Sequence, residues 1–530
     1  MLRSILSMSA ATSLSRITGF LRTMTQAATL GTGAIAGAYT LSNALPTQIY
    51  ELFMGGLLSS ILVPLLIERL ARRGAADARA FINALLTLIS PLLALLALLG
   101  IIFAEPIILL TTDWASSPSL DPGEATRRID LAVLLFRVFA LQIVFYGAGA
   151  LATGILNAHR RFFLPTFAPV LNNLAVILSF GIYAILAGRS PEAAIYTLAV
   201  GTTLGVAIMS LMLVPPAVRL GYKPELRIGH PALASAARLA APVLIFVAAT
   251  VAVQVAANLF ASRSDGVDEL YYAFIIFLLP YGIFVVSIVT ALVPELSEKF
   301  SQRDPDGYRS TLSFGLRTTL FVTIPALVAL ATLAVPIVGL LYERGEFGAG
   351  DTQLVATVLV AFAVGLPGYA VQLMLVRSFY ARQNSMTPAV LNVGLFVVFV
   401  ALSYFLSNAF GLSGVALGFS AAYTLLAIAL LFAMRQQING LQGWRLARSL
   451  SKILVAGIVM YAVASVGLTL TGPGSSFIGR TLVVGAVGGA AIASYVGIAF
   501  LLGAEELRSI ISALSRQRAN DGPLAGRETL

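Results

Sequence analysis

Two arginines in the first long apolar segment are the residues with the clearest chemistry in this chain. Arg16 and Arg22 lie in the stretch "ATSLSRITGFLRTMTQAATLG", residues 11–31, which contains no acidic residue. Arginine stays protonated at any physiological pH, and its planar guanidinium holds carboxylate or phosphate oxygens in pairs. Unpaired arginines inside such a segment therefore predict a site for an anion, and a diphosphate suits the pair best.

Helical periodicity places both arginines in one polar stripe. At about 100° per residue, the polar and small residues fall within a wedge of about 120°. The members of this wedge are Thr12, Ser15, Arg16, Gly19, Arg22, Thr23 and Gln26. Exposing an arginine to lipid costs about 2.5–3.5 kcal/mol on insertion scales, so the stripe should face protein or a watery cavity. The alternatives are that Arg16 snorkels to the interface, or that the arginines neutralise a buried acid.

The second segment supplies further polar side chains. The stretch "SNALPTQIYELFMGG" ends in Glu51, an acidic residue well inside an apolar segment, which we expect either to pair with Arg16 or Arg22 or to titrate as a coupling group. Arg137 could add a cation to the same cavity or lie near the outer surface, and Asn172 and Asn173 favour interhelical hydrogen bonds over ligand binding. The predicted substrate-binding residues are Ser15, Arg16, Arg22, Thr23, Asn43, Gln48 and Tyr50.

Composition and charge distribution indicate a polytopic membrane protein. The 530 residues are 58% hydrophobic and 11% charged, with a mean hydropathy of +0.90. Fourteen apolar segments are long enough to span a bilayer, and helices are the expected structure at that length. One alternating set of loops, together with Arg3 and the C-terminal tail, holds 25 of the 34 Lys and Arg residues. The positive-inside rule therefore predicts cytoplasmic termini and an even number of spans.

Several function classes lack the residues that they need. The chain has no cysteine and two histidines, His159 and His230, so we expect no thiolate site, no metal site and no cofactor. No phosphate-binding loop or hydrolase motif is present, so we expect a transporter without catalytic residues. The net charge of +10 sits in short loops between apolar segments, which argues against nucleic acid as a partner.

A repeat divides the predicted helices into two similar halves. The stretch "LVPLLIERLARR" at 62–73 matches "LVPELSEKFSQR" at 292–303, and "PVLNN" at 169–173 resembles "AVLNV" at 389–393. An offset of six helices preserves orientation, so the halves should be related by a pseudo-twofold axis along the membrane normal. The predicted parts are residues 1–218 (helices 1–6), 219–436 (helices 7–12), 437–505 (helices 13 and 14) and a polar tail at 506–530.

These stretches together resemble the MurJ/MviN family of lipid II flippases in the MOP exporter superfamily. The similar segments span roughly residues 12–393 and include "SRITGFLRT", "LVPLLIE", "GILNAHRRFFLPTFAPVLNN", "LPYGIFVVSIVTALVPELSEKF", "LYERGEF" and "RSFYARQNSMTPAVLNV". The family's two arginines of helix 1 match Arg16 and Arg22. The sequence departs from the family where Thr23 replaces an acid, and where Tyr50 and Ile275 replace cavity arginines.

The resemblance implies a flippase that moves the undecaprenyl-diphosphate-linked peptidoglycan precursor from the cytoplasmic to the outer leaflet of the bacterial cytoplasmic membrane. Two lobes would alternate around a cationic cavity, and helices 13 and 14 would form a groove for the lipid tail. Its partners would be lipid II or a related polyprenyl-diphosphate lipid, membrane lipids and other cell-wall synthesis proteins. Alternatives are an MOP flippase for another lipid-linked glycan, a MATE-like ion-coupled drug exporter, and a scaffold that transports nothing.

Overall fold

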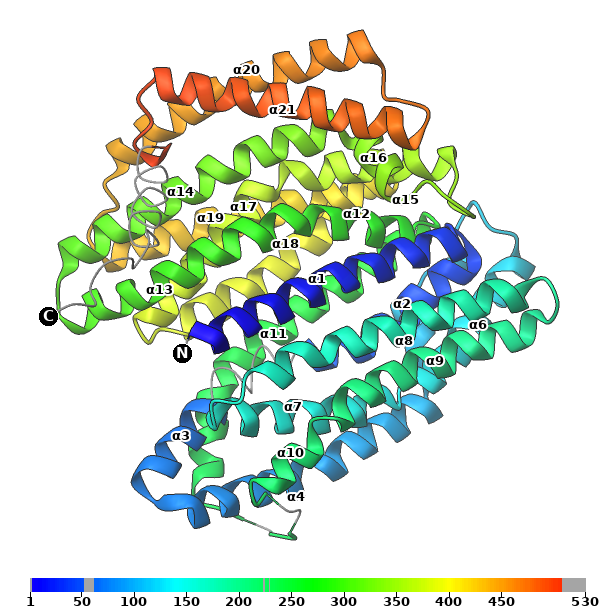
Figure 1. The fold of residues 1–530 in the computed structure, drawn as a ribbon, viewed down its shortest axis with the longest axis vertical. Helices are drawn as coiled ribbons and strands as arrows, with labels where there is room; N and C mark the ends of the chain where they lie inside the picture. The colour runs from blue at the N-terminus through cyan, green and yellow to red at the C-terminus, as the bar shows by residue number, and fades with distance from the viewer. Residues whose placement is uncertain (1, 52–61, 223–224, 228, 508–530) are drawn as a thin grey trace, which may run out of the picture. The chain divides into compact units, whose positions relative to one another are not determined.

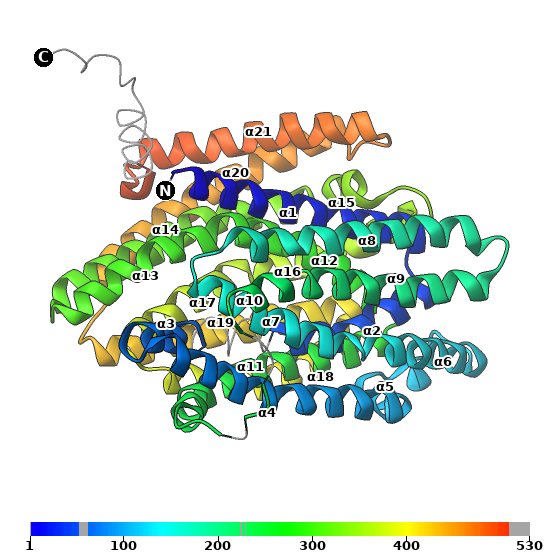
Figure 2. The ribbon, with the colours of Figure 1, turned by 60° about the horizontal axis from the view of Figure 1, so that its bottom comes forward.

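The computed structural model describes residues 2–51, 62–222, 225–227 and 229–507, and every regular element in these ranges is a helix (Figures 1 and 2). Residues 52–61, which end the second predicted segment, lie outside the described residues. So does nearly all of the predicted polar tail.

Most helices are long and apolar enough to cross a membrane. Among the described residues eleven helices meet this test, and a twelfth span results if the bent pair of α16 (Ala349–Val364) and α17 (Leu366–Ala381) is counted as one. The prediction of an all-helical polytopic membrane protein is confirmed. The count of fourteen is consistent with these helices but stays a prediction, because α1 (Leu2–Leu30) is not among the eleven and the second segment is interrupted by residues 52–61.

The chain divides into two compact units that interleave along the sequence. Unit 1 comprises residues 1–272, 341–355 and 392–418, and unit 2 comprises the remaining residues. Of the five boundaries, the first and the last fall inside α12 (Val267–Pro280) and α19 (Leu412–Gln437). The predicted lobe boundaries at 218 and 436 follow the repeat instead, and they stay a prediction.

Unit 1 contains the N-terminal helices and both predicted arginines. Helices α8 and α9 lie side by side in both views, and α1 packs along α8 (Figures 1 and 2). An added Cβ at Gly201 or Gly205 of α9 would overlap Ser179 or Asn172 of α8, so small residues permit this close packing. Besides α1, the unit contains α2 (Ala34–Glu51), α3 (Val63–Arg72), α4 (Gly74–Ile102), α5 (Ala104–Thr111), a short 3₁₀ turn (Trp114–Ser116), α6 (Pro122–Phe139), α7 (Gln142–Ala158), α8 (Phe163–Ala187), α9 (Pro191–Leu211), α10 (Val214–Arg219), α11 (Ala232–Arg263), the start of α12 (Val267–Pro280) and most of α18 (Met386–Phe410).

Unit 2 is built around α14 and the C-terminal helix pair. Helices α20 and α21 lie side by side in both views, and α14 packs against α20 (Figures 1 and 2). Phe321, Met460 and Tyr495 are core residues from these three helices. The remaining helices are α13 (Val286–Ser301), α14 (Pro305–Thr332), α15 (Ala334–Tyr342), α16, α17, α19 (Leu412–Gln437), α20 (Gly443–Thr471) and α21 (Phe477–Leu501).

Two irregularities interrupt predicted spans. A π-helical turn at Tyr281–Val285 follows Pro280, as expected where a proline lacks the N–H that continues the helical ladder. Helices α16 and α17 meet at an angle of 46° at Gly365. A Cβ at Gly365 would lie 2.5 Å from Cα of Ser420, so the glycine permits close contact between backbones.

Candidate functional site

Arg22 lies among three tyrosine hydroxyls in unit 1. Its guanidinium is within hydrogen-bonding reach of the Tyr271 hydroxyl, and Tyr39 and Tyr146 are its other close polar neighbours. We call these four residues, which come from α1, α2, α7 and α12, the Arg22 cluster. Neither Arg22 nor Arg16 forms a salt bridge within the part of the chain that the structure describes.

Ring packing fixes two of the tyrosines. Tyr39 is 3% exposed and lies edge-on to Phe139 and Phe180, with ring centroids 5.6 and 5.4 Å away. The Tyr146 ring packs against Tyr50 at a centroid distance of 4.5 Å. These ring contacts restrict the orientation of both side chains, whose hydroxyls interact electrostatically with Arg22.

The first turns of α12 hold the turn between α1 and α2. The Tyr272 hydroxyl donates to the Gly31 carbonyl at 3.1 Å, and the Gly33 N–H donates to the Asp268 carboxylate at 3.0 Å. Tyr271 precedes Tyr272 on the same helix. The contacts that hold the turn thus also place the Tyr271 hydroxyl beside Arg22.

The remaining residues predicted in the first segment are placed differently from Arg22. Arg16 is exposed, and no contact with the cluster is seen for it. The Ser15 carbonyl accepts a hydrogen bond from Asn173 of α8 at 3.3 Å. Thr23 is buried, and its hydroxyl donates to the Gly19 carbonyl of its own helix at 3.3 Å. The arginines therefore share a helix but do not meet at the cluster.

The second segment brings one predicted residue to the cluster and leaves others without partners. Tyr50 reaches the cluster through its contact with Tyr146. The side-chain oxygen of Asn43 and both amide atoms of Gln48 are buried without a hydrogen-bond partner among the described residues. Such groups are normally satisfied by water or a ligand.

Glu51 ends α2 at the edge of the described residues. Its side chain is exposed and its charge interacts with Tyr50 and Tyr146. It makes no ion pair with Arg16 or Arg22. Arg137 is exposed on α6, and no described contact joins it to the Arg22 cluster.

Sequence reasoning missed Tyr39, Tyr146 and Tyr271. A tyrosine inside an apolar stretch such as "LQIVFYGAGAL" or "ELYYAFIIFL" is usually a core or interfacial residue. The available signal was the depth of these hydroxyls within predicted spans, where each needs a polar partner.

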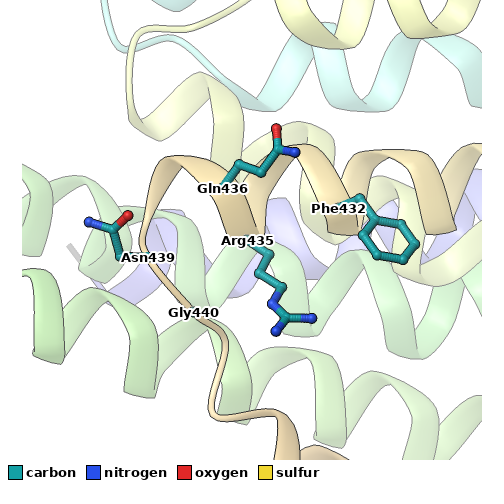
Figure 3. A pocket seen from close by; sticks show the side chains of 5 residues that line it. All are labelled: Phe432, Arg435, Gln436, Asn439 and Gly440. Atoms are coloured by element: carbon teal, nitrogen blue, oxygen red, sulfur yellow. The ribbon is translucent and has the colours of Figure 1, made fainter.

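A pocket lies elsewhere, in unit 2, at the C-terminal end of α19. It measures about 420 Å³, and Figure 3 shows the side chains that line it: Phe432, Arg435, Gln436, Asn439 and Gly440. None of the predicted substrate-binding residues contributes to it. We therefore base the site on Arg22.

An all-helical bundle with eleven or twelve apolar spans among the described residues is the architecture of a polytopic membrane transporter. A sequence model of the family described as lipid II flippase MurJ matches residues 26–480. The chain belongs to this family of transporters.

Curated relatives match over nearly the whole chain. A probable lipid II flippase MurJ of Rhizobium tropici is 30% identical over 98% of this chain and 97% of its own length. The lipid II flippase MurJ of Burkholderia cenocepacia is 27% identical, covering 82% of this chain and 84% of its own length.

Solved structures agree on the fold. A lipid II flippase MurJ in an inward closed conformation gives a TM-score of 0.75 at 25% identity, covering 95% of this chain and 99% of that one. An inward-facing MATE family multidrug resistance transporter of the MOP superfamily gives a TM-score of 0.65 at 17% identity. The match covers 83% of this chain and 99% of that one. At that identity the MATE likeness shows the fold alone.

Proposed function

We propose that this chain flips lipid II across the cytoplasmic membrane and binds the lipid's diphosphate at Arg22. The observation that carries the proposal is the Arg22 guanidinium, which lies among tyrosine hydroxyls with no carboxylate paired to it in the described residues. A cation inside a membrane-spanning helix without a counter-ion is costly, and a substrate diphosphate would supply the missing charge. The lipid II flippase relatives support the same substrate.

The proposed direction is from the cytoplasmic to the outer leaflet, by alternating access without ATP and with both termini in the cytoplasm. The membrane potential, negative inside, is worth about 2.3 kcal/mol per charge per 100 mV. It would drive the anionic headgroup outward and favour return of the emptied cationic site. A flipping assay that is insensitive to dissipation of the potential would argue against this step.

The C-terminal pair α20 and α21 is proposed to bind the lipid tail. Large apolar side chains project outward from both helices, including Ile458 and Leu470 of α20 and Leu482 and Phe500 of α21. Such surfaces suit contact with acyl or prenyl chains. Interaction with other cell-wall synthesis proteins is likewise a proposal.

Complementation of a strain depleted of its own lipid II flippase tests the function. The wild-type chain should restore growth, and Arg22→Ala should abolish rescue although the protein reaches wild-type levels in the membrane. Arg16→Ala tests whether the exposed arginine also contacts the headgroup. Arg137→Ala serves as the matched control, because Arg137 lies outside the Arg22 cluster, and it should rescue growth fully.

Two results would contradict the proposal. Failure of the wild-type chain to rescue growth would contradict lipid II as the substrate. Full rescue by Arg22→Ala would show that the charge on α1 is not needed for transport, as a scaffold would predict.

A further inference from the structure

The three hydroxyls around Arg22 differ in whether their protons are already used. A tyrosine hydroxyl has one proton to donate and lone pairs that accept, whereas a guanidinium only donates. Each tyrosine can therefore accept from Arg22. Only one whose proton has no acceptor in the protein can also donate to a bound anion.

The Tyr146 proton is already used. Tyr146 hydrogen-bonds to the Thr47 hydroxyl. The proton of Thr47 is itself donated to the Asn43 carbonyl at 2.8 Å, so Thr47 must accept from Tyr146. Tyr146 can then orient Arg22 but has no proton left for a ligand.

The Tyr39 proton is shared with a neighbour. The Tyr39 hydroxyl lies 3.0 Å from the Thr202 hydroxyl, and one of the two donates to the other. Tyr39 is also 3% exposed, which leaves a ligand little access to it. It is therefore a poor donor to a headgroup.

Tyr271 differs from both. Its hydroxyl interacts with the donor-only guanidinium of Arg22, so its oxygen accepts, and no acceptor for its proton is found within the described ranges. Its side chain is partly exposed, unlike those of Tyr39 and Tyr146. The Arg22 N–H groups and the Tyr271 O–H thus form two neighbouring donors, and both side chains are partly exposed.

We propose that Tyr271 is a second headgroup-binding residue, which donates its hydroxyl proton to the same diphosphate that Arg22 neutralises. The proposal rests on the function proposed above. A neutral hydroxyl donor beside the guanidinium would add a hydrogen bond to the same anion without adding charge.

The test measures binding to the purified full-length protein in detergent. The probes are undecaprenyl diphosphate, which has no glycan, and lipid II. A hydrogen bond to a charged group supports a loss of about 10- to 100-fold when its donor is removed. Tyr271→Phe should weaken the binding of both probes by that factor, with no change in the thermal unfolding midpoint. Tyr146→Phe should weaken binding less, because the Tyr146 proton is already donated to Thr47.

Tyr308→Phe is the matched control. It removes a hydroxyl that donates to the Ser378 carbonyl in unit 2, and binding should match the wild type. Wild-type affinity in Tyr271→Phe together with lost affinity in Arg22→Ala would overturn the role of Tyr271 and leave the proposed function standing. Equal losses of affinity in Tyr271→Phe and Tyr146→Phe would also overturn the role of Tyr271. So would a Tyr271→Phe variant that binds lipid II more weakly but undecaprenyl diphosphate as tightly as the wild type. Full affinity in Arg22→Ala would instead contradict the proposed function.

Discussion

Asn173 and Asn392 make equivalent hydrogen bonds in two different helix pairs of unit 1. The Asn173 amide of α8 donates to the Thr18 hydroxyl of α1 at 3.1 Å, and the Asn392 amide of α18 donates to the Thr250 hydroxyl of α11 at 2.9 Å. Each amide also donates to a backbone carbonyl of the same partner helix. The repeat aligns Asn392 with Asn172, and Asn173 lies one residue later, so the two contacts occupy neighbouring positions of the matched stretches. Similar contacts between corresponding helix pairs are compatible with a duplicated bundle, and the pseudo-twofold axis stays a prediction.

Replacing either asparagine by alanine should cost little stability. Thr18 and Thr250 already donate to carbonyls of their own helices. Interhelical hydrogen bonds in membrane proteins contribute about 0.6 kcal/mol on average and at most about 1.7 kcal/mol. Asn173→Ala and Asn392→Ala should therefore show similar, small reductions in the free energy of unfolding in detergent. Asn408→Ala, on the exposed side of α18, is the control. A large loss in only one of the pair would argue against equivalent roles.

Gly345→Ala should be far more destabilising than an ordinary glycine replacement. Gly345 has a φ of 61°, and an added Cβ would overlap the Ala28 carbonyl of α1. That carbonyl cannot withdraw freely, because it accepts the Glu346 N–H at 3.0 Å.

Gly74→Ala separates the cost of the left-handed backbone from the cost of the overlap with α1. Gly74 has a φ of 84° and open space around it, so its replacement should cost only the left-handed backbone penalty of about 1–2 kcal/mol. Thermal unfolding of both variants measures the difference. Equal losses would show that contact with α1 does not contribute.

Arg317 joins α14 to the end of the C-terminal helix pair. Its guanidinium donates to Glu505 and Glu506 at 2.8 Å each, and Glu506 is 2% exposed. Arg317→Met would leave the Glu506 charge buried, with the Ser449 hydroxyl as its remaining partner among the described residues. We expect a loss of about 3–5 kcal/mol in unfolding free energy. Adding Glu506→Gln should recover much of it, and no recovery would indicate that lost packing, not charge, is the cause.

The contact between Arg317 and Glu505 also makes the stability of the protein slightly dependent on pH. Arg317 lowers the pKa of the Glu505 carboxyl below its ordinary value of 4.5, chiefly through their hydrogen bond. The resulting stabilisation is present above pH 4.5 and is lost as the pH falls through the lowered folded-state pKa. Its size is small because the Glu505 side chain is 73% exposed. Unfolding midpoints of the wild type and Glu505→Gln should therefore converge as the pH is lowered, and a constant difference would contradict this account.

The helical architecture could be predicted because a bilayer sets the length of its spans. Each apolar segment of about 20 residues must satisfy its backbone internally, which leaves a helix. Breaks within spans follow less directly from sequence. Pro280 precedes a π-helical turn, whereas Pro325 lies inside the uninterrupted helix α14. The difference depends on what packs beside each proline.

The site was only partly predictable for a related reason. Arg22 stands out because a charge in an apolar segment is costly wherever it lies. Tyr146 and Tyr271 do not stand out, since tyrosine is common in membrane helices and their meeting with Arg22 depends on tertiary packing. The split between Arg16, which is exposed, and Arg22 also depends on packing, since helical periodicity places both in one stripe.

Glu51→Gln should tighten diphosphate binding at the Arg22 cluster. The Glu51 charge interacts with Tyr146, which also neighbours Arg22, and it is not paired with either arginine. Two like charges about 10 Å apart at an effective dielectric constant of about 40 repel by roughly 0.8 kcal/mol, so we expect a gain of up to about fourfold in affinity. Binding of undecaprenyl diphosphate to Glu51→Gln measures this gain. Glu192→Gln, in the exposed first turn of α9, controls for the change in net charge. If Glu51 instead titrates during transport, its glutamine variant will bind the probe tightly but flip lipid II slowly at every pH. Weaker binding by Glu51→Gln would contradict both the repulsive role and the titrating role. It would mean that the Glu51 carboxylate favours diphosphate binding.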